Sequence, residues 1–337
     1  MTSGPRQLLS LLAVLGAVAV PLLVAGLGAD GVGPARGLSA ADLAARTPRI
    51  AAQVEQLRDL RFERPPRTRI VGARRVRAQF VHQQGRYEKQ LETAEDAYKT
   101  LGIVAADESL ADVGSSVAEQ VDGYYDPKAK RLFIVRSGAG EDPAGARLTI
   151  AHELDHALED QRFGIGEPSD DVSDDRGLAE SALIEGSATE VEARYALRYV
   201  DFSALLRVAT AADQAVDAAA ASLPKAFEAE LNFPYLRGQR FVDSLRKLGS
   251  GWNLVDIALR SRPPLSTEQV LHPLKYLDYE RPLPVVLRAG DSLPSGWRHL
   301  SGGVIGEYET YLMLRPALGE AAARRAAAGW GGQRLQL

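Results

Sequence analysis

The sequence contains no cysteine in 337 residues, and its charges nearly balance at a formal net charge of −4. The missing cysteines exclude disulfide bonds and thiolate ligands, so any metal ion must be bound by histidine and carboxylate side chains. The near balance of charges gives no reason to expect nucleic acid as a partner. No internal repeat is present, and the length suits one main domain with appendages.

Charged residues are missing from one long run near the N-terminus, LLSLLAVLGAVAVPLLVAGLGA, residues 8–29. Its length is closer to the about 20 residues that span a bilayer than to the about 7–15 of a signal peptide core. Residues 1–29 are therefore predicted to be a signal peptide or, with slight preference, an uncleaved membrane anchor. Arg6 precedes the run and favours a cytoplasmic N-terminus, so the bulk of the chain is expected outside the cytoplasm, anchored or secreted.

Residues 30–66 are predicted to be a linker followed by a flanking helix over about 39–60, which ends before Pro65 and Pro66. The remaining residues, 67–337, are predicted to form the main domain. Long helices are expected over 143–163 and 178–200, and the C-terminal third has helical periodicity again. Residues 121–135, VDGYYDPKAKRLFIV, have the turn and the apolar run of a β-hairpin or of a pair of adjoining strands.

Two of the five histidines lie four positions apart in TIAHELDHALED, residues 149–160. On a helix, His152 and His156 lie on one face, so both imidazoles can reach a single metal ion. Glu153 follows the first histidine and is placed to act as base toward a water on that ion, as in the H-E-x-x-H motif. The segment therefore predicts a zinc site with one Zn²⁺ per chain.

A catalytic zinc ion normally has three protein ligands and one open position. No third histidine follows at short spacing, so we expect a carboxylate from the next helix. Glu185 lies in the apolar stretch ALIEG, where a lone carboxylate is costly unless it is paired or metal-bound, and Glu180 is the alternative. Glu190 and Glu192 are typical of an exposed, salt-bridged face.

HELDH followed on a second helix by EGSA resembles the gluzincins, the zinc metallopeptidases related to thermolysin and the M1 aminopeptidases. The wider series GYYDP, AHELDHALEDQRFG, ALIEGSATEVE, FPYLRGQRFV and STEQVLHPLKY, within about residues 90–315, is similar to a group of predicted bacterial extracytoplasmic metallopeptidases. The resemblance implies that His152, His156 and Glu185 bind zinc and that Glu153 is the catalytic base. Residues 67–337 would then be a catalytic domain.

The resemblance also implies an edge strand that binds an extended peptide by strand addition. This strand is expected at Arg131, Leu132, Phe133, Ile134 and Val135. The implied fold is α+β and mainly helical, a zincin-like domain with a small antiparallel sheet against the H-E-x-x-H helix and a helical C-terminal part.

The sequence departs from the thermolysin pattern in two places. Thermolysin-like enzymes have an aspartate four residues after the ligand glutamate, and here that position is Thr189, so Thr189, Glu190 or Ser181 is expected to brace a histidine instead. The 28 residues between His156 and Glu185 also exceed the usual spacing, which keeps Glu180 open as the ligand.

The predicted function is a zinc-dependent peptidase that hydrolyses peptide or protein substrates outside the cytoplasm. Its tetrahedral intermediate needs a hydrogen-bond donor, for which Tyr235, His272 and Tyr276 are the candidates in the C-terminal third. An alternative is a non-catalytic, zinc-stabilised surface binding protein, but a purely structural site has no use for Glu153. An aminopeptidase is a third possibility, although no anionic site for a substrate α-amine is evident.

Overall fold

The computed structural model describes residues 39–76, 78, 88–110, 123–136, 143–165, 174–208, 224–287 and 302–336. The apolar run predicted to be a signal peptide or anchor lies outside these residues. Within them, no helix combines the length and the apolar character needed to cross a bilayer.

The centre of the fold is α7 (Asp174–Tyr199), a helix covered by neighbours on several sides. It packs against α6 (Pro143–Phe163) and, over the largest contact in the fold, against α9 (Lys225–Leu248). Small and apolar side chains such as Ala179, Ala182 and Ala188 are fully buried on α7 and let these helices approach closely. The two long helices predicted at 143–163 and 178–200 are therefore confirmed, with α7 beginning four residues earlier.

The predicted flanking helix is α2 (Ala40–Arg58), which begins at a capping box formed by Ser39 and Asp42. Its apolar side chains Leu43, Ile50 and Val54 belong to the same hydrophobic core as those of α6 and α7. The predicted division at residue 66 therefore does not separate this helix from the main domain, because α2 is part of that domain's core.

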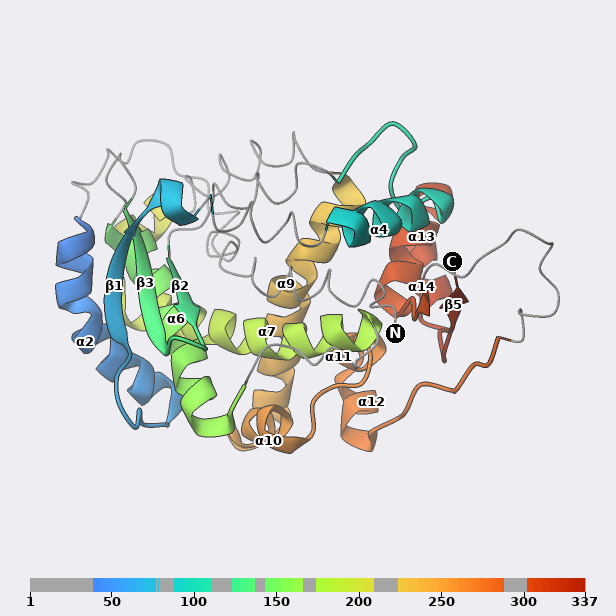
Figure 1. The fold of residues 1–337 in the computed structure, drawn as a ribbon. Coiled ribbons are helices and arrows are strands. Elements are labelled where there is room, and N and C mark those ends of the chain that lie inside the picture. The colour runs from blue at the N-terminus through green and yellow to red at the C-terminus, as the bar shows by residue number, and fades with distance from the viewer. Residues whose placement is uncertain are drawn as a thin grey trace.

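Three strands form a sheet with the order β1-β3-β2: β1 (Arg67–Gly72), β2 (Gly123–Asp126) and β3 (Arg131–Arg136). β2 and β3 form the predicted antiparallel hairpin, whereas β1 joins β3 in parallel. The sheet packs on α6 on the left of Figure 1. The fold is α+β and mainly helical, as predicted. The sheet is mixed rather than purely antiparallel, because β1, which precedes the hairpin in the chain, pairs with β3 in parallel.

β3 is the central strand, and the prediction that residues 131–135 form an edge strand is wrong. Both sides of β3 are occupied, by β1 and by β2. Strand addition at Arg131–Arg136 is therefore blocked, and among the described strands β2 is the one at the edge beside α6.

The C-terminal part is helical, as predicted, and packs against α7 and α9. Its elements are α10 (Asn253–Ser261), α11 (Thr267–Leu271), α12 (Pro273–Asp278), α13 (Glu307–Leu318), α14 (Glu320–Ala327) and a two-stranded sheet of β4 (Gly302–Gly303) with β5 (Leu335–Gln336). A further helix, α4 (Glu88–Thr100), lies near α13 in Figure 1.

Candidate metal centre

The histidine pair lies in the middle of α6, a helix buried almost all round. Leu154 and Leu158 are fully buried in the core and fix the rotation of the helix about its axis. The helix ends at Gly164, whose φ of 69° is favourable for glycine and whose N–H donates to the carbonyl oxygen of Asp160. This rotation directs His152 and His156 toward α7.

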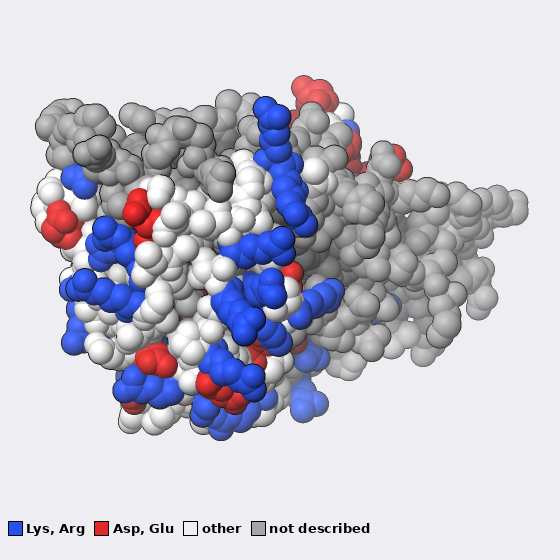
Figure 2. All heavy atoms as spheres, turned by 60° about the vertical axis from the view of Figure 1, so that its left-hand side comes forward, with Lys and Arg blue, Asp and Glu red and all other residues white. Residues whose placement is uncertain are grey.

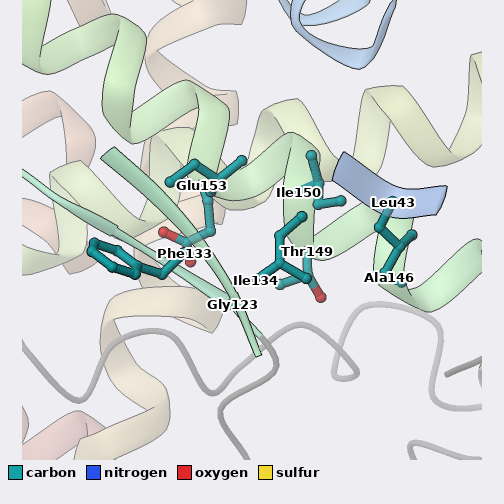
Figure 3. Close-up of a pocket in the computed structure, with 9 residues that line it drawn as sticks. Leu43, Gly123, Phe133, Ile134, Ala146, Thr149, Ile150 and Glu153 are labelled. Carbon is teal, nitrogen blue, oxygen red and sulfur yellow. The ribbon is translucent and has the colours of Figure 1, made fainter. Parts of the chain in front are cut away.

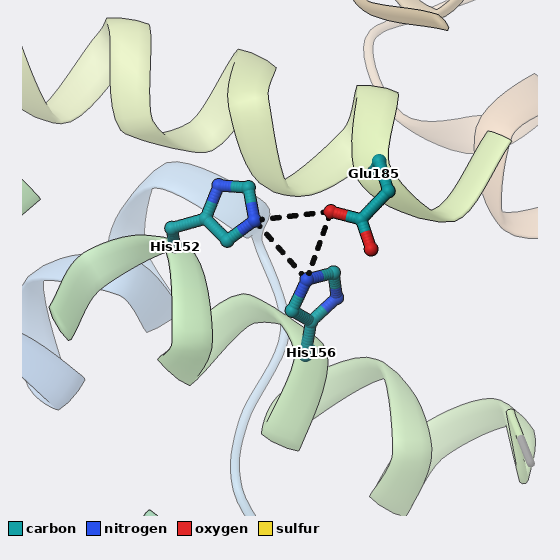
Figure 4. A group of neighbouring side chains, drawn as sticks. All are labelled: His152, His156 and Glu185. Atoms are coloured by element: carbon teal, nitrogen blue, oxygen red, sulfur yellow. Dashed lines mark hydrogen bonds and ion pairs between the residues drawn. The ribbon is translucent and has the colours of Figure 1, made fainter. Parts of the chain in front are cut away.

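His152, His156 and Glu185 bring one ligand atom each to a common point between α6 and α7 (Figure 4). The two Nε2 atoms are 3.1 Å apart, and Oε2 of Glu185 is 3.3 Å from Nε2 of His152 and 3.4 Å from Nε2 of His156. The three atoms form a nearly equilateral triangle in a site where His152 and Glu185 are buried.

This triangle has the dimensions of a zinc site. Ligand atoms at about 2.0–2.1 Å from a tetrahedral zinc ion lie about 3.3–3.4 Å from one another, close to all three observed separations. Two imidazoles and one carboxylate are a donor set that zinc accepts, and three ligands leave one position open. The residues therefore fit a catalytic rather than a closed structural zinc site.

The electrostatics of Glu185 also suit a ligand. Burial alone would raise the pKa of its carboxyl, but His156 and His152 outweigh burial and lower the pKa to about 2. Glu185 is thus ionised and available to a cation at neutral pH. Glu180, the alternative ligand, instead pairs with Arg176 at 2.8 Å and lies outside the triangle.

Glu153 is buried beside the triangle without belonging to it. Its Oε2 accepts a hydrogen bond of 2.8 Å from the backbone N–H of Tyr125 on β2, whereas Oε1 is buried without a partner among the described residues. Burial raises the pKa of this carboxyl, and His156 and His152 oppose the rise. A carboxylate with one anchored and one unpaired oxygen is suited to exchange a proton.

Glu153 also borders a small cavity lined by residues of α2, α6, β2 and β3 (Figure 3). Its volume is about 10 Å³, which is close to the room that one water molecule needs. Thr149 and the carboxylate of Glu153 are polar groups in an otherwise apolar lining.

Glu192 is a functional residue that the sequence reasoning missed. It was predicted on an exposed face, but it is buried, and its Oε2 lies 3.3 Å from Nδ1 of His152. A carboxylate on the far ring nitrogen fixes the orientation of a metal-binding histidine and keeps Nε2 available to the metal. The contact is of ion-pair length, and it takes the place that was expected for Thr189, Glu190 or Ser181. A spacing of seven residues from Glu185, two helical turns, is the signal that could have found it.

The three residues expected as braces have other partners or none. Thr189 donates to the backbone oxygen of Glu185, one turn back on α7. Glu190 is buried rather than exposed, and it pairs with Arg194 and, across to α9, with Arg246, each at 2.7 Å. The Ser181 hydroxyl has no partner among the described residues.

Of the three predicted oxyanion donors, the structure brings only Tyr235 to the centre. Its ring lies 6.3 Å from that of His152 in a stacked orientation, and its hydroxyl hydrogen-bonds with Glu185. Burial raises the pKa of the phenol, and Glu185 and Glu153 raise it further, so Tyr235 stays protonated.

His272 and Tyr276 are held elsewhere. Nε2 of His272 lies 2.9 Å from Glu307 on α13, and the Tyr276 hydroxyl donates to the carbonyl oxygen of Arg262. These contacts hold His272 to α13 and Tyr276 to the end of α10, while α11 packs on α7, α9 and α13 and α12 packs on α9.

An ion cluster supports α6 from the side of α2. Arg58 is fully buried and pairs with Asp155 at 3.3 Å, Glu159 at 3.0 Å and Asp256 at 2.9 Å, while its guanidinium lies 4.1 Å from the centre of the Trp252 ring. Burial and the neighbouring Asp155 raise the pKa of Glu159 to about 8. Because Asp155 and Glu159 flank His156 on α6, this cluster ties the metal-site helix to α2 and α10.

No family model matches the chain, and no curated protein matches it. A solved structure from Chloroflexus aurantiacus, described as "a putative hydrolase with a novel fold", is similar over 80% of this chain and 97% of that one, at 17% identity and a TM-score of 0.45. This likeness is too weak to assign a fold family or a chemistry to the chain.

Proposed function

We propose that this protein is a zinc-dependent peptidase that acts outside the cytoplasm. The observation that carries the proposal is the triangle of His152, His156 and Glu185, whose 3.1–3.4 Å separations fit three ligands of one tetrahedral ion. Glu153 beside the triangle supports an enzyme over a zinc-stabilised binding protein, because a structural site does not require a buried carboxylate with an unpaired oxygen.

In the proposed reaction, zinc, Glu153 and Tyr125 have different roles. Zinc, when bound, would supply Lewis acidity, which lowers the pKa of water and polarises a carbonyl oxygen. Glu153 takes a proton from the attacking water on its unpaired oxygen and delivers it to the leaving amine. The hydrogen bond from Tyr125 holds the other oxygen, so the carboxylate keeps its orientation while the proton moves.

Tyr235 is the donor that we assign to the developing oxyanion. A phenol whose pKa is raised by burial keeps its proton, and its one hydrogen bond would pass from Glu185 to the carbonyl oxygen as that oxygen gains charge. Its place over His152, beside Glu185, supports this role. The loss of one such donor costs about 2.7–4 kcal/mol of transition-state stabilisation in acyl-transfer enzymes.

An extended substrate would bind along β2 rather than along β3. β2 is an edge strand, and the N–H of Tyr125 points away from β3 toward Glu153. A peptide that adds to this edge would pass directly by the catalytic carboxylate. The Tyr125 side chain is itself fixed, because its hydroxyl donates to Asp160 at 2.6 Å.

The test measures bound zinc by elemental analysis and casein cleavage on the full chain and on three variants. Glu185→Gln is expected to lose zinc and activity, and Glu153→Gln is expected to keep zinc and lose activity. Glu180→Gln is the matched control on the same helix and is expected to keep both. Zinc that is absent from the wild type, or retained in Glu185→Gln, would overturn the ligand assignment. Zinc retained together with full cleavage by Glu153→Gln would overturn the proposed base.

A further inference from the structure

A second cavity lies away from the metal centre, where α2 faces the start of α6 and the end of α7. Its volume is about 490 Å³, within the range of small-molecule pockets, about 300–1,000 Å³. The side chains that give it chemical character are Arg46, Arg49, Arg147, Arg198, Tyr195 and Tyr199. None of them belongs to the proposed active site.

The walls of this cavity are held by hydrogen bonds. The Tyr195 hydroxyl donates to Oε1 of Gln53 at 3.0 Å and so joins α7 to α2. Nη2 of Arg147 donates to the carbonyl oxygen of Tyr199 at the end of α7. This hydrogen bond joins the start of α6 to the end of α7. These two bonds fix Tyr195 and Arg147, which line the inner part of the cavity.

The cavity has an excess of positive charge, with four arginines and one acidic residue, Asp201, in its lining. Arg46, Arg49 and Arg198 have exposed side chains, and none of them pairs with a carboxylate among the described residues. The acid that lines the cavity, Asp201, is bound to the Ser203 hydroxyl and the Ala204 N–H at the start of the next helix. Three guanidinium groups around one cavity repel one another unless an anion lies between them.

The surrounding face extends this positive field. Figure 2 looks at the side that carries α2 and β1, and lysine and arginine side chains gather there. Residues 39–75 contain nine arginines against four acidic residues, and all of the nine except the buried Arg58 can contribute to this face. Such a field attracts anions toward the cavity.

We propose that this cavity is a binding site for a phosphate ester. Guanidinium groups donate two parallel hydrogen bonds to phosphate oxygens and bind phosphate better than a point charge would. The volume exceeds that of a bare phosphate ion and accommodates the organic part of the ester against Tyr195 and Tyr199. The same group occurs in soluble organic phosphates and in lipid headgroups, and the two sources are separated by the test.

The test is calorimetric titration of the full chain in a non-ionic detergent with three probes: glycerol 3-phosphate, dihexanoyl phosphatidylglycerol and dihexanoylglycerol. Binding of glycerol 3-phosphate indicates a soluble ester, and binding of the phosphatidylglycerol alone indicates a lipid headgroup. Both results support the site. Binding of neither phosphate probe, or equal binding of dihexanoylglycerol, which has no phosphate, would overturn it.

A matched pair of variants tests the location. Arg46→Gln/Arg49→Gln is expected to weaken binding by roughly tenfold to a hundredfold, because two charge-assisted contacts are lost. Arg67→Gln/Arg69→Gln removes the same charge from exposed positions on β1 and is expected to change binding less than about threefold. Equal weakening in both pairs would show general attraction to the face and would overturn the cavity as the site. Zinc content and casein cleavage are expected to stay unchanged in both pairs.

Discussion

The crossing of α7 and α9 leads to a sharp prediction for Gly238. A Cβ atom at this position would lie 2.0 Å from the carbonyl oxygen of Ala182, and one at Gly186 would lie 2.2 Å from the carbonyl carbon of Gly238. Both neighbours are backbone atoms, so no side-chain rotation can relieve the clash. To restore even 3.0 Å, the shortest separation that real Cβ atoms tolerate, α9 must move about 1 Å away from α7.

The Gly238→Ala variant is expected to lose about 2 kcal/mol of the free energy of unfolding. Overpacking costs about 1–3 kcal/mol, and we take the upper end because backbone meets backbone. The better helix propensity of alanine returns about 1 kcal/mol. The measurement is urea unfolding of the full chain in detergent, monitored by circular dichroism.

The same shift of α9 should lower the rate of cleavage without lowering the amount of bound zinc. Tyr235 lies three residues before Gly238 on α9, so it would move away from Glu185, whereas the three proposed ligands lie on α6 and α7. A displacement of about 1 Å can cost about a hundredfold in rate, so casein cleavage should fall by that order with zinc retained.

Gly145→Ala is the matched control. Its Cβ would lie 3.8 Å from Val208, an ordinary contact, and the substitution should raise the free energy of unfolding by up to about 1 kcal/mol with cleavage unchanged. If Gly238→Ala proves as stable and as active as this control, the close crossing does not position Tyr235, and the reasoning fails.

Three further predictions concern buried charges. Glu192→Gln should weaken zinc binding about 10–100-fold in a chelator competition assay, because His152 loses its brace. Arg58→Met should lower the free energy of unfolding by about 3–5 kcal/mol in urea, because Asp155 stays buried without its cation. Burial raises the pKa of Asp175 from 3.8 to about 7, so the folded protein binds the extra proton and loses stability as pH rises toward 7. Asp175→Asn removes this loss, and its stability relative to wild type should improve by about 2 kcal/mol between pH 5 and 7 in thermal unfolding.

Each of these three has an outcome that contradicts it. Unchanged zinc affinity in Glu192→Gln would mean that His152 is oriented by its packing alone. A loss below about 1 kcal/mol in Arg58→Met would mean that Asp155 is neutral without the arginine. A stability difference between Asp175→Asn and wild type that is constant with pH would mean that Asp175 titrates near its ordinary pKa.

The sequence was sufficient for features that depend on local periodicity. The helix over 143–163 follows from its apolar spacing, and the face shared by His152 and His156 follows from that helix. Glu185 was favoured over Glu180 because its neighbours are apolar, and the structure places Glu185 in the triangle. Local patterns also predicted the hairpin of β2 and β3.

The errors arose where distant parts of the chain meet. Glu192 has the polar neighbours of an exposed helix face, but α7 is enclosed by several other helices, so the usual rule for charged residues fails there. The central position of β3 depends on β1, which pairs from more than sixty residues away and leaves no local signal. His272 and Tyr276 were candidates as hydrogen-bond donors in the C-terminal third, but their actual partners are set by tertiary packing.

The Arg58 cluster also determines when the molecule can be completed during synthesis. Arg58 and Asp256 are 198 positions apart, so their contact cannot form until about three quarters of the chain has been made. Until then, the apolar face of α2 lacks its full cover, and α6 lacks the support of α10. Contacts of such long range form slowly, so we expect the support of α6 by α10 to be completed late in the synthesis of the chain or after it. Under the proposed function, the chain would therefore reach its full activity only once most of it has been made.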